Sequence, residues 1–176
     1  MIVRPATTAD VPALADLAAR TFPLACPPGM PQVDMDAFIA EHLSPERFDR
    51  YLADETAEVL VAEDEIGPVG YTLTFLREPY AEDLAALVTH RPTVELSKCY
   101  ADPRAHGTGV AARLMEEVLQ RARAAGATSV WLGVNGRNLR AQRFYAKHGF
   151  TVIGGRRFVV GRHTEDDLVL ERVLTD

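Results

Sequence analysis

The sequence has little of several features that define common protein classes. Its 176 residues include only two cysteines, Cys26 and Cys99, which form no Cys-x-x-Cys pair, and this argues against a disulfide scaffold or a zinc site. The five histidines show no ligand spacing on a shared helix, so no metal is expected. No apolar run reaches about 18 residues and no secretory segment follows Met1, so we expect a cytoplasmic protein with no membrane partner.

An excess of positive charge is also missing. The formal net charge is −6, from 25 acidic against 19 basic residues, which disfavours binding to nucleic acid and is compatible with a cationic small molecule. With 47% hydrophobic residues, no repeat and no linker, the chain is long enough for one core and short for two. We therefore expect a single domain over residues 1–176, as a monomer or a homodimer.

A glycine-rich stretch, Arg104-Ala-His-Gly-Thr-Gly-Val-Ala-Ala112, lies between a strand-like run and a helical run. The strand-like run is Val94 to Ala101, and Asp102-Pro103 ends it because proline cannot donate to the ladder. In the following run, apolar residues recur at the helical period up to Gly126. Free amides at the start of that helix, beside glycines without a Cβ, form a site for an anion such as a pyrophosphate.

Two other phosphate sites do not fit these residues. The loop of nucleoside triphosphatases ends in Gly-Lys-Ser/Thr, and no such ending follows Gly109. The dinucleotide fingerprint matches formally at Gly107, Gly109 and Ala112, but the next strand, 129–134, ends in Asn135-Gly136 and offers no carboxylate for a ribose. A plain strand-to-helix turn remains the alternative to an anion site.

A second informative segment runs from Asn138 to Phe150. It predicts a short helix with Asn138 near its start and Gly149 at its stop. Asn138, Ala141 and Tyr145 fall on one stripe, so an amide and a phenol face the same neighbour. Simple core packing of the aromatic residues is the alternative interpretation.

Together, the patterns Arg-x-x-Gly-x-Gly and Asn-x-x-Ala-x-x-Phe-Tyr-x-Lys-x-Gly-Phe, one helix and one strand apart, resemble the Gcn5-related N-acetyltransferase (GNAT) superfamily. The resemblance covers nearly the whole chain. Within the superfamily, the segments 95–100, 131–134 and 158–170 look closest to the PaiA-like polyamine acetyltransferases. The resemblance implies an α/β (α+β) fold with a twisted, mostly antiparallel sheet of about seven strands flanked by helices. The implied activity is transfer of acetyl from acetyl-coenzyme A to a primary amine, by direct attack in a ternary complex.

The resemblance also implies which residues hold acetyl-coenzyme A. The pyrophosphate binds the amides of the glycine turn with Arg104 beside them, and the pantetheine pairs with the backbone of the strand that ends at residues 99–101. Asn138 contacts the cofactor arm. The full expected set is Cys99, Tyr100, Ala101, Arg104, Gly107, Thr108, Gly109, Val110, Ala111, Ala112, Asn138, Tyr145 and Lys147.

Two residues are the expected catalytic groups. Tyr145 resembles the general acid of the family, which protonates coenzyme A as it leaves. Glu95 matches a position where several members carry a base that acts directly or through water. Strict alternation places residues 95, 97 and 99 on one face of the strand and 94, 96, 98 and 100 on the other. An ion pair or exposure to solvent is the alternative for Glu95.

Two segments without a motif are expected to shape the acceptor site. They are the turn-rich connection 22–31 and the loop 78–92. Their neighbouring acids either receive a cationic amine or only hydrate the surface; they are Asp34, Asp36, Glu82 and Asp83. A polyamine-like small molecule is the favoured acceptor. A protein lysine or N-terminal acetyltransferase, and an acyl-coenzyme A sensor without turnover, are the alternatives.

The periodicities predict the positions of the secondary-structure elements. Strands are expected near 2–5, 58–64, 68–76, 93–101, 129–134, 151–160 and 166–173. Helices are expected near 10–21, 34–43, 45–54, 109–125 and 138–148, with a helix start at Ser44-Pro45.

Overall fold

The computed structural model describes residues 1–174, and its elements follow one another along the chain in the order that the periodicities predict. Their order is β1 (Ile2–Pro5), η1 (Thr8–Asp10), α1 (Val11–Ala25), α2 (Gln32–His42), α3 (Pro45–Ala53), β2 (Ala57–Glu63), β3 (Pro68–Leu76), α4 (Glu82–Leu87), β4 (Thr93–Ala101), η2 (Pro103–Ala105), α5 (Val110–Ala124), β5 (Ser129–Asn135), α6 (Leu139–Lys147), β6 (Thr151–Val160) and β7 (His163–Val173). Every expected strand and helix is confirmed to within a few residues.

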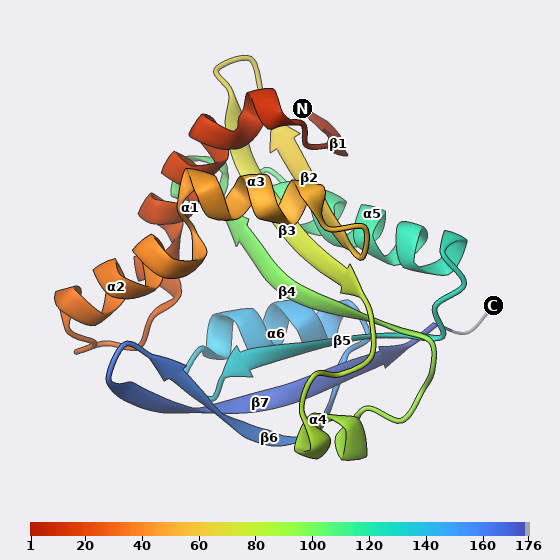
Figure 1. Ribbon diagram of the computed structural model, residues 1–176. Helices are drawn as coiled ribbons and strands as arrows, with labels where there is room; N and C mark the ends of the chain where they lie inside the picture. Colours follow the sequence, from red (N-terminus) through yellow and green to blue (C-terminus); the bar gives the residue numbers. More distant parts are fainter. Residues whose placement is uncertain (175–176) are drawn as a thin grey trace.

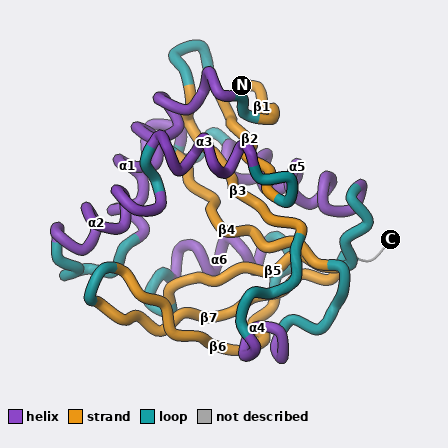
Figure 2. The backbone as a smooth tube through the Cα atoms, in the orientation of Figure 1, coloured by secondary structure: helices purple, strands orange, loops and turns teal. Residues whose placement is uncertain are grey.

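The strands form one twisted sheet in the order β1-β2-β3-β4-β5-β7-β6 (Figure 1). All neighbouring pairs are antiparallel except β4 and β5, which run parallel. This parallel pair is short, because only residues 93–95 of β4 face residues 129–131 of β5. Beyond that point the two strands diverge, as the tubes in Figure 2 show. The expected α/β fold with a mostly antiparallel sheet is therefore confirmed.

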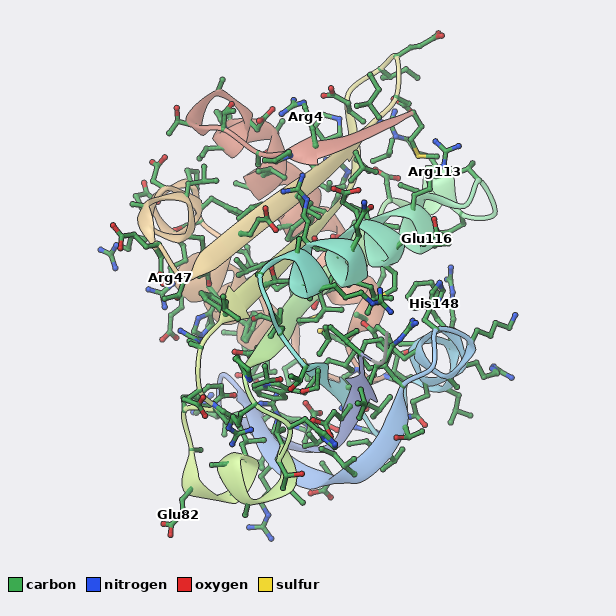
Figure 3. All side chains as sticks on the ribbon, turned by 90° about the vertical axis from the view of Figure 1, so that its right-hand side faces the viewer. Arg4, Arg47, Glu82, Arg113, Glu116 and His148 are labelled. Atoms are coloured by element: carbon green, nitrogen blue, oxygen red, sulfur yellow. The ribbon has the colours of Figure 1, made fainter. Side chains whose placement is uncertain are left out.

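Helices cover both faces of the sheet. On one face, α1 and α3 pack on a buried cluster that includes Leu14, Phe48 and Tyr71. On the other face, α5 buries Leu114 and Met115 against a second cluster, and α6 packs beside it through partly buried side chains. Figure 3, viewed from the side, shows α3 near Arg47 and α5 near Arg113 as separate layers. None of the helices in residues 1–174 has the length and apolar character that crossing a bilayer requires.

Two helical segments differ from the prediction. The helix α1 continues to Ala25, so the first part of the expected turn-rich connection is helical although it contains Pro23. Proline removes one helical hydrogen bond, but Thr21 and Phe22 are buried here and their packing holds the last turn. The expected loop 78–92 contains α4, whose buried Leu84 packs with Trp131 and Val169. These tertiary contacts are not readable from local sequence.

The faces of β4 also differ from the prediction, because β4 contains a bulge. Leu73 of β3 faces Lys98 while the next residue, Thr74, faces Leu96, so Ser97 is the extra residue. Directly opposed residues share a face, and β3 therefore places Glu95 together with Lys98 and Tyr100. Strict alternation, which separated Glu95 from these two residues, is wrong. The residues on the α5 side are Val94, Leu96, Cys99 and Ala101.

Candidate functional site

A cavity of about 1110 Å³ passes through the opening between β4 and β5. One end is lined by the start of α5 and by α6, and the other by α1, α3, the end of β3 and β7. Pockets for single small ligands have volumes of roughly 300–1,000 Å³, so this cavity has room for two molecules that meet in the opening.

The start of α5 presents free backbone amides to this cavity. The first intrahelical bond runs from the amide of Arg113 to the carbonyl of Gly109 at 3.0 Å, which leaves the amides of residues 110–112 without intrahelical acceptors. Gly107 and Gly109 have φ of +81° and +83°, and a Cβ at either position would meet no atom within 4 Å. The turn is therefore open, left-handed at both glycines and suited to an anion.

Two residues of the expected cofactor set lie outside the lining of this cavity. The guanidinium of Arg104 is 3.5 Å from Asp64 and donates to the carbonyl of Pro68 at 3.3 Å. The hydroxyl of Thr108 donates to the carbonyl of Ala105 at 2.7 Å. Backbone amides, rather than the Arg104 side chain, are thus what the turn offers to an anion. The other expected residues line the cavity: Cys99, Tyr100, Ala101, Gly107, Gly109, Val110, Ala111, Ala112, Asn138, Tyr145 and Lys147.

The second half of β4 forms one wall of the cavity. Residues 96–101 have no partner on β5, so their backbone faces the opening on that side. Tyr100 stacks on Tyr71 with ring centroids 5.7 Å apart, on the α1 side of the sheet. Burial raises the pKa of the Cys99 thiol to about 12. Cys99 therefore stays a thiol at neutral pH and is a poor nucleophile, which favours chemistry without a covalent cysteine intermediate.

The helix α6 supplies the opposite wall. The Oδ1 atom of Asn138 accepts a hydrogen bond from the amide of Ala141 at 3.1 Å, so Asn138 caps the helix. Tyr145 packs edge-on against Phe144 and Phe150, with centroids 5.4 and 5.8 Å apart. Burial raises the pKa of the Tyr145 phenol well above its ordinary value. Its hydroxyl is a proton donor at neutral pH, as a general acid requires.

Three buried carboxylates line the far end of the cavity. Glu95 accepts a hydrogen bond from Arg77 at 3.3 Å, and the Arg77 guanidinium lies 3.8 Å from the centroid of Phe75. Glu165 accepts from Arg137 at 2.7 Å and from Asn135 at 3.2 Å, which holds its pKa below the usual range although burial acts against this. The third carboxylate belongs to Asp167.

Asp167 differs from the other two acids. Its side chain is 7% exposed, and its Oδ1 atom has no hydrogen-bond partner. The nearest cation, the Arg156 guanidinium, is 4.0 Å from Oδ2. Burial raises the pKa of Asp167 to about 6, with Arg156 acting in the opposite direction and the charges of Glu165 and Asp166 adding to the rise.

A cation, Lys98, shares the far end of the cavity with these acids. The ammonium lies 5.5 Å from the centroid of Tyr51. Burial lowers its pKa to about 8, with Glu95 opposing and Arg47 assisting that shift. The far end of the cavity is thus polar and carries charges of both signs.

The acids expected to shape the acceptor site lie elsewhere. Asp34 accepts a hydrogen bond from the amide of Arg162 at 3.3 Å and closes α2 on the β6–β7 turn. Asp36 accepts from Gln32 at 2.8 Å, and Asp83 accepts from the amide of Leu84 at 2.9 Å. Glu82 points away from the molecule in Figure 3. None of these four acids lines the cavity.

Sequence reasoning missed Glu165 and Asp167. Both lie on one face of β7, where residues 165, 167, 169 and 171 are buried, while Thr164 and Asp166 are exposed. Acids at alternate positions of a strand carry the signal, since the same period-two rule that marks apolar faces applies to them. Within residues 1–174, no group of three or more His, Cys, Asp or Glu residues is arranged to hold a metal ion.

Comparisons with known proteins agree with this geometry. The model of the acetyltransferase (GNAT) family matches residues 12–150. An uncharacterised N-acetyltransferase of Mycobacterium tuberculosis (strain H37Rv) is 45% identical over 165 residues, which cover 94% of this chain and 98% of that protein.

Solved structures with the same fold include two with a ligand named in their descriptions. The PaiA N-acetyltransferase of Thermoplasma acidophilum in complex with coenzyme A has a TM-score of 0.76 at 18% identity, and the match covers 98% of both chains. The putative acetyltransferase yncA of Salmonella typhimurium with acetyl-coenzyme A has a TM-score of 0.67 at 22% identity, covering 100% of this chain and 95% of that one. With the family model matching most of its length, this chain belongs to the acetyltransferase (GNAT) family.

Proposed function

We propose that this enzyme transfers an acetyl group from acetyl-coenzyme A to the primary amine of a small molecule, by direct attack of the amine in a ternary complex. One observation carries the proposal: a single cavity joins the anion-binding turn at α5 to a polar chamber on the other face of the sheet, through the opening between β4 and β5. Two substrates that enter from opposite faces meet in that opening.

The residues present fit acetyl-coenzyme A. Its pyrophosphate is matched by the amides of residues 110–112 and by the open glycines before them. Its amide-containing arm is matched by the unpaired backbone of β4 after Glu95, which offers strand-like hydrogen bonds. Arg140 and Lys147 of α6 line the same end of the cavity and supply positive charge near the phosphates. When bound, the cofactor supplies a thioester carbonyl and a thiol leaving group.

Tyr145 is the proposed general acid. It projects from α6 into the wall of the cavity opposite β4, and its raised pKa keeps the hydroxyl protonated over the physiological range. A positioned phenol can therefore donate its proton to the departing sulfur. Two carboxylates remain candidates for accepting the proton of the amine, namely Glu95, which the family resemblance implies, and Asp167.

The enclosed shape of the far end of the cavity, the proposed acceptor chamber, favours a small molecule over an extended peptide. Residues from several elements enclose it: Phe22 of α1, Phe38 of α2, Tyr51 of α3 and Tyr80 before α4 all line the cavity. An extended peptide would need an open groove with free strand edges. A polyamine-like amine is the first class to test, since Glu165 and Asp167 of β7 present negative charge to the chamber. Action in the cytoplasm, and a monomeric or homodimeric state, remain predictions from the sequence.

The test is a turnover screen with acetyl-coenzyme A. The panel contains spermidine, other small primary amines, an aminoglycoside, and a lysine-bearing peptide, and the measurements are thiol release and the mass of the acetylated product. We expect acetylation of a small amine with kcat/KM at least tenfold above that of the peptide. Faster acetylation of the peptide would refute the acceptor class. Calorimetric binding of acetyl-coenzyme A without turnover of any amine would instead support the sensor alternative.

A further inference from the structure

The three acids at the far end of the cavity are not equivalent. Glu95 and Glu165 each accept hydrogen bonds from an arginine, whereas Oδ1 of Asp167 is buried and accepts none. A buried carboxylate oxygen without a donor loses the hydration it had in the unfolded chain and gains nothing in return. Asp167 is thus the acid with an unused acceptor atom at this cavity.

Asp167 lies one strand away from the opening between β4 and β5. It is on β7 and pairs with Asn135, the last residue of β5, which is the strand that borders the opening. Across that opening lies Tyr100 of β4, whose phenol has its pKa raised by burial and, further, by the charge of Asp167. The charges that face Asp167 therefore come from β4, β6 and β7: Tyr100 when ionised, Arg156, Glu165 and Asp166.

The pair with Arg156 does not account for Asp167. The 4.0 Å separation is longer than a hydrogen bond. Arg156 donates instead to the hydroxyl of Tyr80, and its guanidinium lies 5.8 Å from the centroid of Trp131. The guanidinium also lies where a side chain on Gly133 would be, so its position is fixed by packing against the sheet. If the only role of Asp167 were to hold Arg156 in place, a direct hydrogen bond between the two side chains would be expected.

We infer that the carboxylate of Asp167 receives the ammonium group of the acceptor and takes the proton that must leave before the nitrogen can attack. This assignment rests on the proposed function. An amine is mostly protonated at neutral pH, so a carboxylate in the chamber that holds it serves both as its counter-ion and as its base. Glu95, already bonded to Arg77, is then not the group that accepts this proton.

An N–H bond of the ammonium breaks and the proton passes to the carboxylate of Asp167, which later releases it to water. The freed electron pair forms the C–N bond, the C–S bond breaks, and the sulfur takes the proton of the Tyr145 hydroxyl. The second proton lost by the nitrogen returns to the Tyr145 oxygen. The net products are the amide, the thiol and one proton.

The test compares Asp167→Asn with Asp166→Asn. These residues are neighbours on β7, but Asp166 points to the exposed face and so controls for charge and for local sequence. On the amine that the wild type acetylates best, we expect Asp167→Asn to lower kcat/KM at pH 7 by about 10². We expect Asp166→Asn to stay within about threefold of the wild type. The KM for acetyl-coenzyme A should be unchanged in both variants.

The pH profile separates a proton acceptor from a structural residue. For the wild type, kcat/KM for the amine should fall below about pH 6 as Asp167 is protonated. In Asp167→Asn the break near pH 6 should disappear, and kcat/KM should instead rise steadily toward about pH 9, because the neutral fraction of the amine grows about tenfold for each pH unit. The defect relative to the wild type should therefore shrink as the pH rises. A merely structural effect would lower the rate equally at every pH.

The possible outcomes are distinct. If Asp167→Asn acetylates the amine as fast as the wild type, or if Glu95→Gln alone abolishes the acidic limb, Asp167 does not accept the proton and the proposed function stands. A uniform loss at every pH, with a lowered melting temperature, also overturns the assignment. If the wild type acetylates no amine, the proposed function fails, and the role of Asp167 fails with it.

Discussion

Removal of the Tyr145 hydroxyl is the most direct test of how this site works. In Tyr145→Phe, the ring keeps its edge-on contacts with Phe144 and Phe150, whose centroids lie 5.4 and 5.8 Å away. The change removes one oxygen atom and leaves the shape of the wall intact. We therefore expect the free energy of unfolding to change by less than about 1 kcal/mol.

Turnover should change far more than stability. Loss of a positioned general acid costs roughly 10² or more in kcat, which corresponds to about 2.7 kcal/mol of transition-state stabilisation. The affinity for coenzyme A should stay within a few-fold, because the amides of residues 110–112 and the β4 backbone are untouched. Since burial raises the pKa of Tyr145 well above its ordinary value, the hydroxyl contributes no falling limb to the wild-type rate below about pH 9.

The assay is thiol release at saturating acetyl-coenzyme A, with calorimetric titration of coenzyme A and a thermal melt of the same preparation. A fall in kcat with unchanged affinity and melting temperature supports the acid. An unchanged kcat would refute it, because the phenylalanine has no proton to give. Weaker coenzyme A binding together with a proportionate loss of kcat/KM would mean that the hydroxyl binds the cofactor instead.

Three further changes test the electrostatics of the cavity. Gly109→Glu should weaken coenzyme A binding at least tenfold in calorimetry. The control Gly109→Ala is equally strained at φ +83°, so it should lower stability with a smaller loss of affinity. Equal affinities for the two variants would argue against an anion at this turn. Asp167→Asn should raise the melting temperature at pH 7.5 and leave it unchanged near pH 3.5. The folded pKa of about 6 lies above the ordinary 3.8, so the charged carboxylate destabilises the fold as the pH rises through that window. The loss of folding free energy is at most about 3 kcal/mol before screening by cavity water. Lys98→Met should stabilise the protein at pH 7 and progressively less toward pH 10.5. The folded pKa of about 8 lies below the ordinary 10.5, so the buried ammonium is unfavourable until it deprotonates. A gain in melting temperature that did not vary with pH would show that packing alone is responsible.

The local rules of sequence were sufficient for most of the fold. The apolar period of α5 and its closing Gly126, with φ of +79°, predicted the helix whose start is the proposed anion site. Ser44 followed by Pro45 marked the start of α3, and the Ser44 hydroxyl accepts from the amide of Arg47 at 3.3 Å. Each of these signals is contained within one element, so no knowledge of tertiary packing was needed.

Features that depend on two strands together were not predictable in this way. The bulge at Ser97 exists only as a mismatch in the register of β3 and β4, and it moves Glu95 to the face of Lys98. The opening between β4 and β5 likewise depends on how far the parallel pairing extends, which ends at Glu95. The short helix α4 forms because Leu84 packs onto β5 and β7, through Trp131 and Val169. A single sequence carries no direct record of these pairings.

The cavity accounts for charged residues at positions where a stable core would be apolar. On β7, Asp167 follows the inward position of Glu165 and precedes that of Val169, which is fully buried and apolar. On β4, Lys98 lies opposite Leu73, again a fully buried apolar residue. Burial shifts the pKa of both charged groups toward the neutral form, so each destabilises the fold while it is charged. Both residues line the cavity, and buried groups with pKa values shifted in this way are concentrated at functional sites.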